Sequence, residues 1–271
     1  MNNGLRQGSV LSPKLFCFYS DKLNKNLNES KIGCHVRGIP MNNFAYADDL
    51  VLLCPSASAL NDLLDICFLF AKGNYIIFSI IKTECMCICP TSVKLSTLPD
   101  IIIGGNIIKY VEFFKYLGHI LNVKFKDDDD ILKEMRNLYA RGNTIVRLFK
   151  NTDDEVKIRI FKCFCYPVYC SSMWSRYNVY TMNKLRVGYN NIFRKLFKIK
   201  LWDEEQGQLD SLSRIYEEMG IRSFYELFRY NAVNCQNRIS LSENPLVQCL
   251  LNSDAMTCSR QWSHWDRILA P

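Results

Sequence analysis

The sequence lacks any long run of apolar residues. Its apolar stretches, such as Leu50–Cys54, are far shorter than the roughly 18 to 20 residues that a membrane-spanning helix needs. Residues 1–9 also lack the apolar core of a signal peptide. We therefore expect a chain that has no membrane partner, is not secreted, and lies inside the cell, in the nucleus or the cytoplasm.

The sequence is also poor in metal-ligand spacings. It has 13 cysteines but only 3 histidines, and no second pair at zinc-site spacing completes four ligands. Because a chain without an export signal is kept reduced, we expect free thiols and not a disulfide framework. The 271 residues, 48% of them hydrophobic, can bury the core of one large or two ordinary domains, which excludes intrinsic disorder.

Positive charge is concentrated in the middle of the chain. The formal net charge is +7, yet residues 131–200 alone hold 15 Lys or Arg against 4 Asp or Glu. Aromatic residues are interleaved with these charges, a composition suited to phosphate contacts and base stacking. An ordinary basic surface over an aromatic core explains the same composition equally well. The aromatic residues are Phe149, Phe161, Tyr166, Trp174, Tyr177, Tyr189, Phe193 and Phe197.

The periodicity predicts an α+β fold in which strands give way to helices near Asp127. Two apolar runs flank Asp48 and Asp49, which predicts a tight hairpin with both acids at its tip. After Asp127 the apolar residues recur at helical spacing. The acidic run Asp127–Asp130 precedes the first of these helices, and we expect it to be a solvated cap at the positive end of the helix dipole and not a cation site.

An Asp pair at a hairpin tip presents hard oxygen ligands to a divalent cation. Mg²⁺ prefers carboxylate oxygens together with substrate phosphates, and two such ions activate a 3′-hydroxyl and stabilise the leaving pyrophosphate in nucleotidyl transfer. Taken alone, an Asp-Asp pair is more often just a turn.

Three motifs accompany this pair in a specific order and spacing. They are Gly4-Leu-Arg-Gln-Gly-Ser-Val-Leu-Ser-Pro-Lys-Leu-Phe16, the Tyr46-Ala-Asp-Asp49 box and Tyr116-Leu-Gly118. Together they resemble the reverse transcriptases of non-LTR (LINE-type) retrotransposons. Lys82-Thr-Glu-Cys-Met86 falls where that family usually carries a lysine. The resemblance is good over about residues 1–200 and vaguer beyond them.

The resemblance implies the role of each site residue. Asp48 and Asp49 would be the catalytic metal ligands, holding Mg²⁺ or, in its place, Mn²⁺. Gly4, Arg6, Gln7 and Gly8 would line the pocket for the template base and the incoming nucleotide, with Lys82 near the triphosphate. Tyr116, Leu117 and Gly118 would form the primer grip. Lys82 is equally explained as a solvated lysine at a strand end.

The resemblance also implies a domain scheme. Residues 1–125 would form a partial polymerase palm, an antiparallel sheet with packed helices. Residues 126–200 would form a basic, helical thumb-like region, followed by a helical carboxyl-terminal region over residues 201–271. Full-length members carry fingers and a first palm strand, with a further metal-binding aspartate, before the Arg-Gln-Gly loop. We therefore expect an amino-terminally truncated element.

The leading interpretation is thus an RNA-directed DNA polymerase fragment that is inactive alone and holds its metal weakly. Its partners would be an RNA template, a DNA primer or hybrid duplex, and deoxynucleoside triphosphates. The alternative is a non-catalytic nucleic-acid-binding module that keeps the basic helices and does no chemistry. Salt-dependent binding to an RNA:DNA hybrid without primer extension would favour this module.

Overall fold

The computed structural model describes the whole chain except residues 1–7, 90–96, 200–201, 204–207, 210 and 270–271. Helices and small two-stranded sheets are both present, in agreement with the predicted α+β class. The chain divides into two compact units, one of residues 1–112 with 243–253 and one of residues 113–242 with 254–271. Within the described residues, no helix is long and apolar enough to cross a bilayer.

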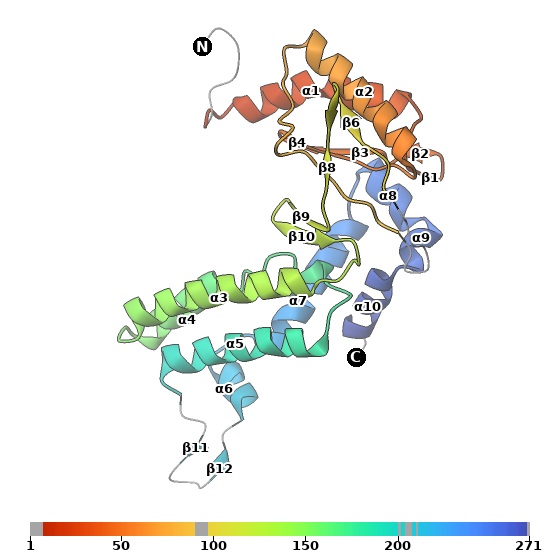
Figure 1. The fold of residues 1–271 in the computed structure, drawn as a ribbon. Coiled ribbons are helices and arrows are strands. Elements are labelled where there is room, and N and C mark those ends of the chain that lie inside the picture. The colour runs from red at the N-terminus through yellow and green to blue at the C-terminus, as the bar shows by residue number, and fades with distance from the viewer. Residues whose placement is uncertain (1–7, 90–96, 200–201, 204–207, 210, 270–271) are drawn as a thin grey trace. The chain divides into compact units, whose positions relative to one another are not determined.

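The first unit combines three helices with four small strand pairs (Figure 1). Its helices are α1 (Ser12–Glu29), α2 (Ala57–Gly73) and α8 (Pro245–Leu251). Its antiparallel pairs are β1 (His35–Val36) with β2 (Ile39–Pro40), β3 (Asn43–Tyr46) with β4 (Asp49–Leu52), and β6 (Ile102–Ile103) with β7 (Asn106–Ile107). The pair of β5 (Glu84–Cys85) with β8 (Lys109–Tyr110) is parallel.

The core of the first unit lies between α1 and α2. Leu23 and Leu27 of α1 are one turn apart and pack against Leu63, Cys67 and Phe70 of α2, because residues at i, i+4 and i+7 share one helix face. Partly buried residues of the β3–β4 hairpin, including Leu50 and Leu52, pack against the same cluster. The hairpin that carries the Asp pair is thus backed by the main core of its unit.

The second unit is mainly helical. Its α-helices are α3 (Asp128–Phe149), α4 (Asp154–Cys165), α5 (Val179–Phe197), α6 (Leu212–Glu218), α7 (Phe224–Ser240), α9 (Asp254–Thr257) and α10 (Arg260–Leu269), with a 3₁₀ turn, η1, at Ser171–Met173. Its antiparallel strand pairs are β9 (Phe113–Tyr116) with β10 (His119–Asn122), and β11 (Trp202–Asp203) with β12 (Gln208–Leu209).

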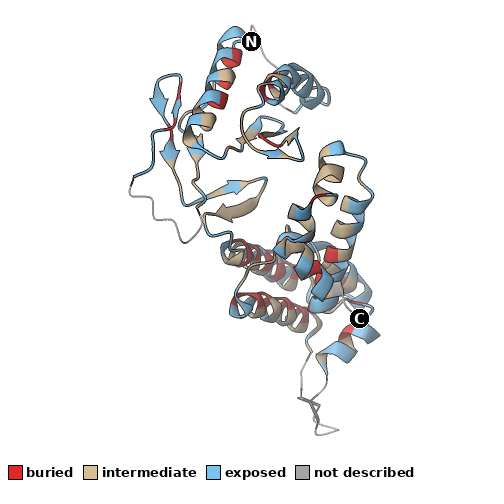
Figure 2. Ribbon diagram, turned by 90° about the vertical axis from the view of Figure 1, so that its right-hand side faces the viewer, coloured by how far each residue is buried: buried red, intermediate tan, exposed pale blue. Residues whose placement is uncertain are grey.

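The core of the second unit is built around α3 and α5. Ile131, Leu138 and Ile145 recur every seven residues and form a buried stripe along α3, as the helical spacing predicted. Figure 2 shows such buried positions on the helices of this unit. The helices approach closely because Gly142 faces Ile192 and Gly188 faces Tyr139, where larger residues would collide.

The eight aromatic residues named above in the basic segment belong to this core. Four of them are buried and the other four are partly buried and packed against it. Phe161 meets Tyr189 and Phe193 edge to face, with ring centroids 5.2 and 5.4 Å apart. For these eight rings the structure favours the aromatic-core explanation of the composition over base stacking.

Replacing Gly142 by alanine tests the contact between α3 and α5. A Cβ at this position would lie 2.3 Å from Cδ1 and 2.5 Å from Cγ1 of the buried Ile192 side chain. We expect overpacking to cost about 1–3 kcal/mol, more than the roughly 1 kcal/mol that alanine gains in helix propensity. Urea unfolding followed by tryptophan fluorescence measures this, because all four tryptophans lie in the second unit.

Gly73→Ala is the matched control. Gly73 ends α2 in the first unit, and a Cβ there would meet no described atom within 4 Å. The fluorescence transition should be unchanged in this variant. A Gly142→Ala protein as stable as the wild type would contradict the packing argument.

Candidate active site

The Asp pair lies at the tip of the β3–β4 hairpin, as the sequence predicted. Tyr46 pairs with Asp49 across the two strands, which leaves Ala47 and Asp48 as a two-residue turn. Ala47 has a φ of +52°, a conformation that two-residue hairpin turns require and that L-residues seldom adopt. Both aspartates are exposed, so their carboxylates are accessible to a ligand.

A buried amide fixes the base of this hairpin. The Asn42 side chain is fully buried and its Nδ2 donates to the carbonyl oxygens of Leu27, at 2.8 Å, and Ile32, at 2.7 Å. Gly33 allows the close approach, because a Cβ there would lie 2.6 Å from Cβ of Asn42. The end of α1 and the start of β3 are thereby tied together, and the tip is held on a fixed base.

Part of the predicted nucleotide-binding set lies outside the described residues. Gly4, Arg6 and Gln7 lie in residues 1–7, so nothing tests their predicted role in lining the pocket for the template base and the nucleotide. Gly8 is described: it is exposed, lies in a turn and has a φ of +83° that favours glycine. Lys82 is also exposed, in a turn where its backbone N–H donates to the carbonyl of Ser79.

The predicted primer-grip residues form a second hairpin tip, in the second unit. Tyr116 pairs with His119, and the turn residues Leu117 and Gly118 have φ values of +46° and +84°. Positive φ at both positions is the type I′ pattern, which matches the twist of a hairpin. The hydroxyl of Tyr169 donates to the carbonyl of Leu117 at 2.6 Å, and Lys133 Nζ donates to the carbonyl of Gly118.

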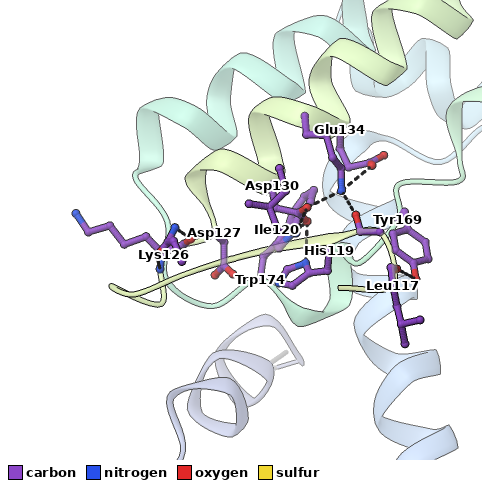
Figure 3. Close-up of polar contacts among 12 residues, drawn as sticks. Leu117, His119, Ile120, Lys126, Asp127, Asp130, Glu134, Tyr169 and Trp174 are labelled. Carbon is purple, nitrogen blue, oxygen red and sulfur yellow. Dashed lines mark hydrogen bonds and ion pairs between the residues drawn. The ribbon is translucent and has the colours of Figure 1, made fainter. Parts of the chain in front are cut away.

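One buried carboxylate joins this hairpin to α3 (Figure 3). Asp130 is fully buried, and its Oδ2 accepts hydrogen bonds from His119 Nδ1 at 2.9 Å and Trp174 Nε1 at 2.8 Å. Its Oδ1 accepts from the backbone N–H of Ile120 at 3.0 Å and from Lys133 Nζ at 2.5 Å. All four donors converge on one side chain, which therefore fixes the position of β10 against the helix.

The acidic run is therefore not the solvated cap that we expected. Besides the buried Asp130, Asp127 Oδ2 accepts from the backbone N–H groups of Ser175, at 2.8 Å, and Arg176, at 2.7 Å. Only Asp129 in this run is exposed. The run faces inward because the backbone N–H groups of a segment about fifty residues further along the chain donate to its carboxylates. The periodicity of the sequence cannot show a contact between segments so far apart.

The pKa values of the buried pair move in opposite directions. Burial would raise the pKa of Asp130, but the hydrogen bonds from His119 and Lys133 outweigh it and hold the pKa well below its usual range. Burial would lower the pKa of His119, but its hydrogen bonds with Asp130 and Cys170 outweigh that effect and raise its pKa to about 9. At neutral pH the two groups form an ion pair.

The Asp pair supplies two of the ligands that a divalent ion needs. No cluster of three or more Asp, Glu, His or Cys side chains that could hold a metal occurs among the described residues. Mg²⁺ is commonly bound by one or two protein carboxylates, with water and substrate phosphates completing its shell. Asp48 and Asp49 fit such an open site and do not form a closed protein cage.

A pocket of about 550 Å³ lies elsewhere, in the second unit. Residues at the end of α4, around α6 and at the start of α7 line it, among them Lys162, Tyr166 and Arg222. None of the predicted site residues belongs to this pocket. It therefore gives no support to a nucleotide site at either hairpin tip.

Comparison with known proteins agrees with the motif order. Residues 1–121, which include both hairpin tips, match the family model described as reverse transcriptase (RNA-dependent DNA polymerase). This part of the chain is similar to reverse transcriptases, and the predicted resemblance to the non-LTR (LINE-type) family is confirmed.

A curated relative extends the similarity past residue 121. The RNA-directed DNA polymerase from mobile element jockey of Drosophila funebris is 27% identical over 209 residues, covering 71% of this chain. The alignment spans 22% of the relative's own length. No solved structure matches the chain.

The His119–Asp130 pair should make the stability of the second unit depend on pH. Because the folded-state pKa of His119 is raised to about 9, its contribution is fully present below the unfolded-state pKa of about 6.5 and is lost as the pH rises through 9. We expect the free energy of unfolding to fall between pH 6.5 and 9.5, measured by urea titration with tryptophan fluorescence.

The variant His119→Gln separates the contribution of His119 to the free energy of unfolding from that of other groups, such as cysteines, that titrate in the same pH range. The variant should be less stable than the wild type at pH 6.5, and its stability should change less between the two pH values. An identical pH dependence in the wild type and the variant would show that His119 is not the titrating group.

Proposed function

We propose that this chain is part of an RNA-directed DNA polymerase of the non-LTR type, in which the β3–β4 hairpin presents two metal-binding aspartates. The observation that carries the proposal is the Tyr46-Ala-Asp-Asp49 box at an exposed, anchored hairpin tip within the matched residues. A chance Asp-Asp turn would not come with the Arg-Gln-Gly loop and Tyr116-Leu-Gly118 in this order.

Asp48 and Asp49 would hold Mg²⁺, or Mn²⁺ in its place, with nucleotide phosphates as further ligands. When bound, the ions supply the positive charge that lowers the pKa of the primer 3′-hydroxyl and stabilises the leaving pyrophosphate. The protein contributes orientation, because the anchored base of the hairpin limits where the two carboxylates can move.

The remaining site residues take the roles that the resemblance implies. Gly4, Arg6, Gln7 and Gly8 would contact the template base and the deoxynucleoside triphosphate, with Lys82 near its phosphates. Tyr116, Leu117 and Gly118 would hold the primer. Residues 1–125 would act as palm, and the basic helices within residues 126–200 as a thumb that contacts the RNA template and the DNA primer.

We further propose that the chain alone is inactive. Two carboxylates at one tip hold a metal weakly, and a further acid must share the ion before both reacting groups are positioned. A misplacement of about 1 Å can cost roughly a hundredfold in rate. The lack of a third acid at the tip among the described residues supports this, and for the isolated chain it also favours the non-catalytic nucleic-acid-binding module.

Terbium luminescence tests the metal site, because Tb³⁺ replaces hard divalent ions and is sensitised by a nearby tyrosine. Tyr46 is 65% exposed and pairs with Asp49, so it is placed to act as the donor. We expect weak, saturable Tb³⁺ emission that Mg²⁺ or Mn²⁺ displaces and that the variant Asp48→Asn/Asp49→Asn loses. Asp65→Asn, which changes an exposed acid on α2, is the control and should keep the signal. Emission that survives the double substitution would place the metal elsewhere.

Primer extension tests the proposed inactivity. With a primed RNA template, deoxynucleoside triphosphates and Mg²⁺, the 271-residue chain should give no product above a protein-free control. Robust synthesis that Asp48→Asn/Asp49→Asn abolishes would show that another acid of this chain completes the site. Asp21 would be the first to test, although it is exposed and pairs with Lys25 at 2.8 Å.

A further inference from the structure

The eight aromatic rings named above in the basic segment are packed into or against the core, so they are not the stacking surface that the composition suggested. Tyr169 and Tyr180 of the same segment are exposed, but the cations over their rings are lysines, Lys133 and Lys184. Exposed tyrosines beside arginines, whose guanidinium planes can also stack on bases, occur at the start of α7, past residue 200. Tyr225 is 64% exposed and Tyr230 is 45% exposed. These two residues lie outside the part of the chain that matches the reverse transcriptase family model.

Each of these tyrosines has a guanidinium over its ring. The Arg222 guanidinium carbon lies 3.8 Å from the ring centroid of Tyr230, and that of Arg186, on α5, lies 6.0 Å from the centroid of Tyr225. Both distances are within the range of a cation–π interaction. Arg229 is also exposed and follows Tyr225 by one turn of α7. The two tyrosines, five residues apart, lie about 140° apart around the helix, at the two edges of its exposed side. We call these five residues, Arg186, Arg222, Tyr225, Arg229 and Tyr230, the α7 tyrosine face.

The backbone beneath this face is firmly held. The opposite side of α7 is buried through Phe224, Leu227, Phe228 and Ala232. The Tyr166 hydroxyl accepts from the backbone N–H of Arg222 at 2.6 Å, and the Tyr189 hydroxyl donates to its carbonyl at 2.7 Å. A tyrosine ring that already contacts a guanidinium, on a helix packed against the core, loses little conformational entropy when a base stacks on it. The entropic cost of binding is therefore small.

The charge of the face is complementary to phosphate. The face contains three arginines and includes one acid within its span of α7, Glu226, whose carboxylate accepts from the backbone N–H of Ser223 at 2.7 Å as part of the capping box of α7. This backbone hydrogen bond lowers the pKa of Glu226, so its carboxylate is ionised and engaged at the helix end. The guanidinium groups beside the tyrosines are thus the groups that suit a phosphate ligand.

We propose that the α7 tyrosine face binds an unpaired nucleic-acid strand, with bases stacked on Tyr225 and Tyr230 and phosphates contacting the arginines. Unpaired bases stack on aromatic rings and guanidinium planes, and RNA and single-stranded DNA share this chemistry. A duplex is a poorer ligand, because its bases are stacked on one another. The inference deepens the proposed function and rests on its nucleic-acid-binding part, not on the Asp pair.

Fluorescence anisotropy with labelled 12-nucleotide oligo(U), oligo(dT) and a blunt hairpin duplex tests the proposal with the full chain. Tyr225→Leu/Tyr230→Leu should bind both single strands at least roughly ten-fold more weakly, given what one base–aromatic stack contributes. Tyr225→Phe/Tyr230→Phe should bind like the wild type, because phenylalanine keeps the stacking ring. Tyr75→Leu, which changes a tyrosine that is 91% exposed in the first unit, is the control and should bind unchanged. The two single strands then show whether the face distinguishes RNA from DNA.

A direct signal covers the case in which the leucine variant does not fold. Tyr225→Trp places a fluorescent ring on the face, and stacking of a base on it should quench its emission on oligo(U) addition. Binding of oligo(U) without quenching, or leucine and phenylalanine variants that bind equally, would overturn the proposal. The proposal would also be overturned if the leucine substitutions weakened duplex binding as much as single-strand binding. Tighter binding of a proline-rich peptide than of every oligonucleotide would overturn it as well.

These outcomes are separable from those of the metal site. The tyrosine variants should keep the Tb³⁺ emission, and Asp48→Asn/Asp49→Asn should keep the oligonucleotide binding. Absence of Tb³⁺ emission together with tyrosine-dependent oligonucleotide binding would contradict the proposed metal site and support the single-strand surface. Loss of oligonucleotide affinity in the aspartate variant would show that the strand binds at the hairpin tip and would overturn the inference.

Discussion

The buried carboxylate of Asp130 is the interaction on which the second unit depends. A buried charge is costly unless it is paired and hydrogen-bonded, and here four donors from three parts of the chain converge on it. His119 and Ile120 come from the hairpin, Lys133 from α3, and Trp174 from the segment between α4 and α5. A shift of any of these parts would leave the charge under-compensated. The same contact therefore fixes the register of the hairpin that ends in Leu117 and Gly118.

Each of the two hairpins is anchored by one buried polar side chain, but the two side chains differ in charge. Behind the β3–β4 tip, the neutral amide of Asn42 satisfies two buried carbonyls, whereas behind the β9–β10 tip the ionised Asp130 collects donors. Asn42 lies at the base of its hairpin, whereas Asp130 accepts hydrogen bonds from His119 and Ile120 directly after the turn, whose carbonyls accept from Tyr169 and Lys133. The neutral anchor does not titrate, so pH affects the position of the second tip far more than that of the first.

The local features were predictable because they depend on neighbours in the sequence. Alternating apolar residues around Asp48 and Asp49 indicated the hairpin, and the seven-residue repeat through Leu138 indicated the buried face of α3. The burial of Asp130 was not predictable, because its partner Trp174 is 44 residues away. The motif order indicated the resemblance to reverse transcriptases, which periodicity could not. The roles of the site residues stay predictions, since Arg6 and Gln7 lie outside the described residues.

The basic segment shows why composition misled about recognition. An amphipathic helix exposes its charged residues and buries its aromatic ones, so interleaving in the sequence becomes separation in space. On α3 to α5 the charged residues are thus separated from the eight core rings, and phosphate contacts alone carry no information about whether bases are paired. Discrimination between single strands and duplexes needs exposed rings beside the charges. In this unit two exposed rings lie beside lysines, Tyr169 near Lys133 and Tyr180 near Lys184, whereas on α7 Arg222 stacks on Tyr230. Because the planar guanidinium can itself stack on a base and an ammonium group cannot, α7 is the better suited of these places to unpaired bases.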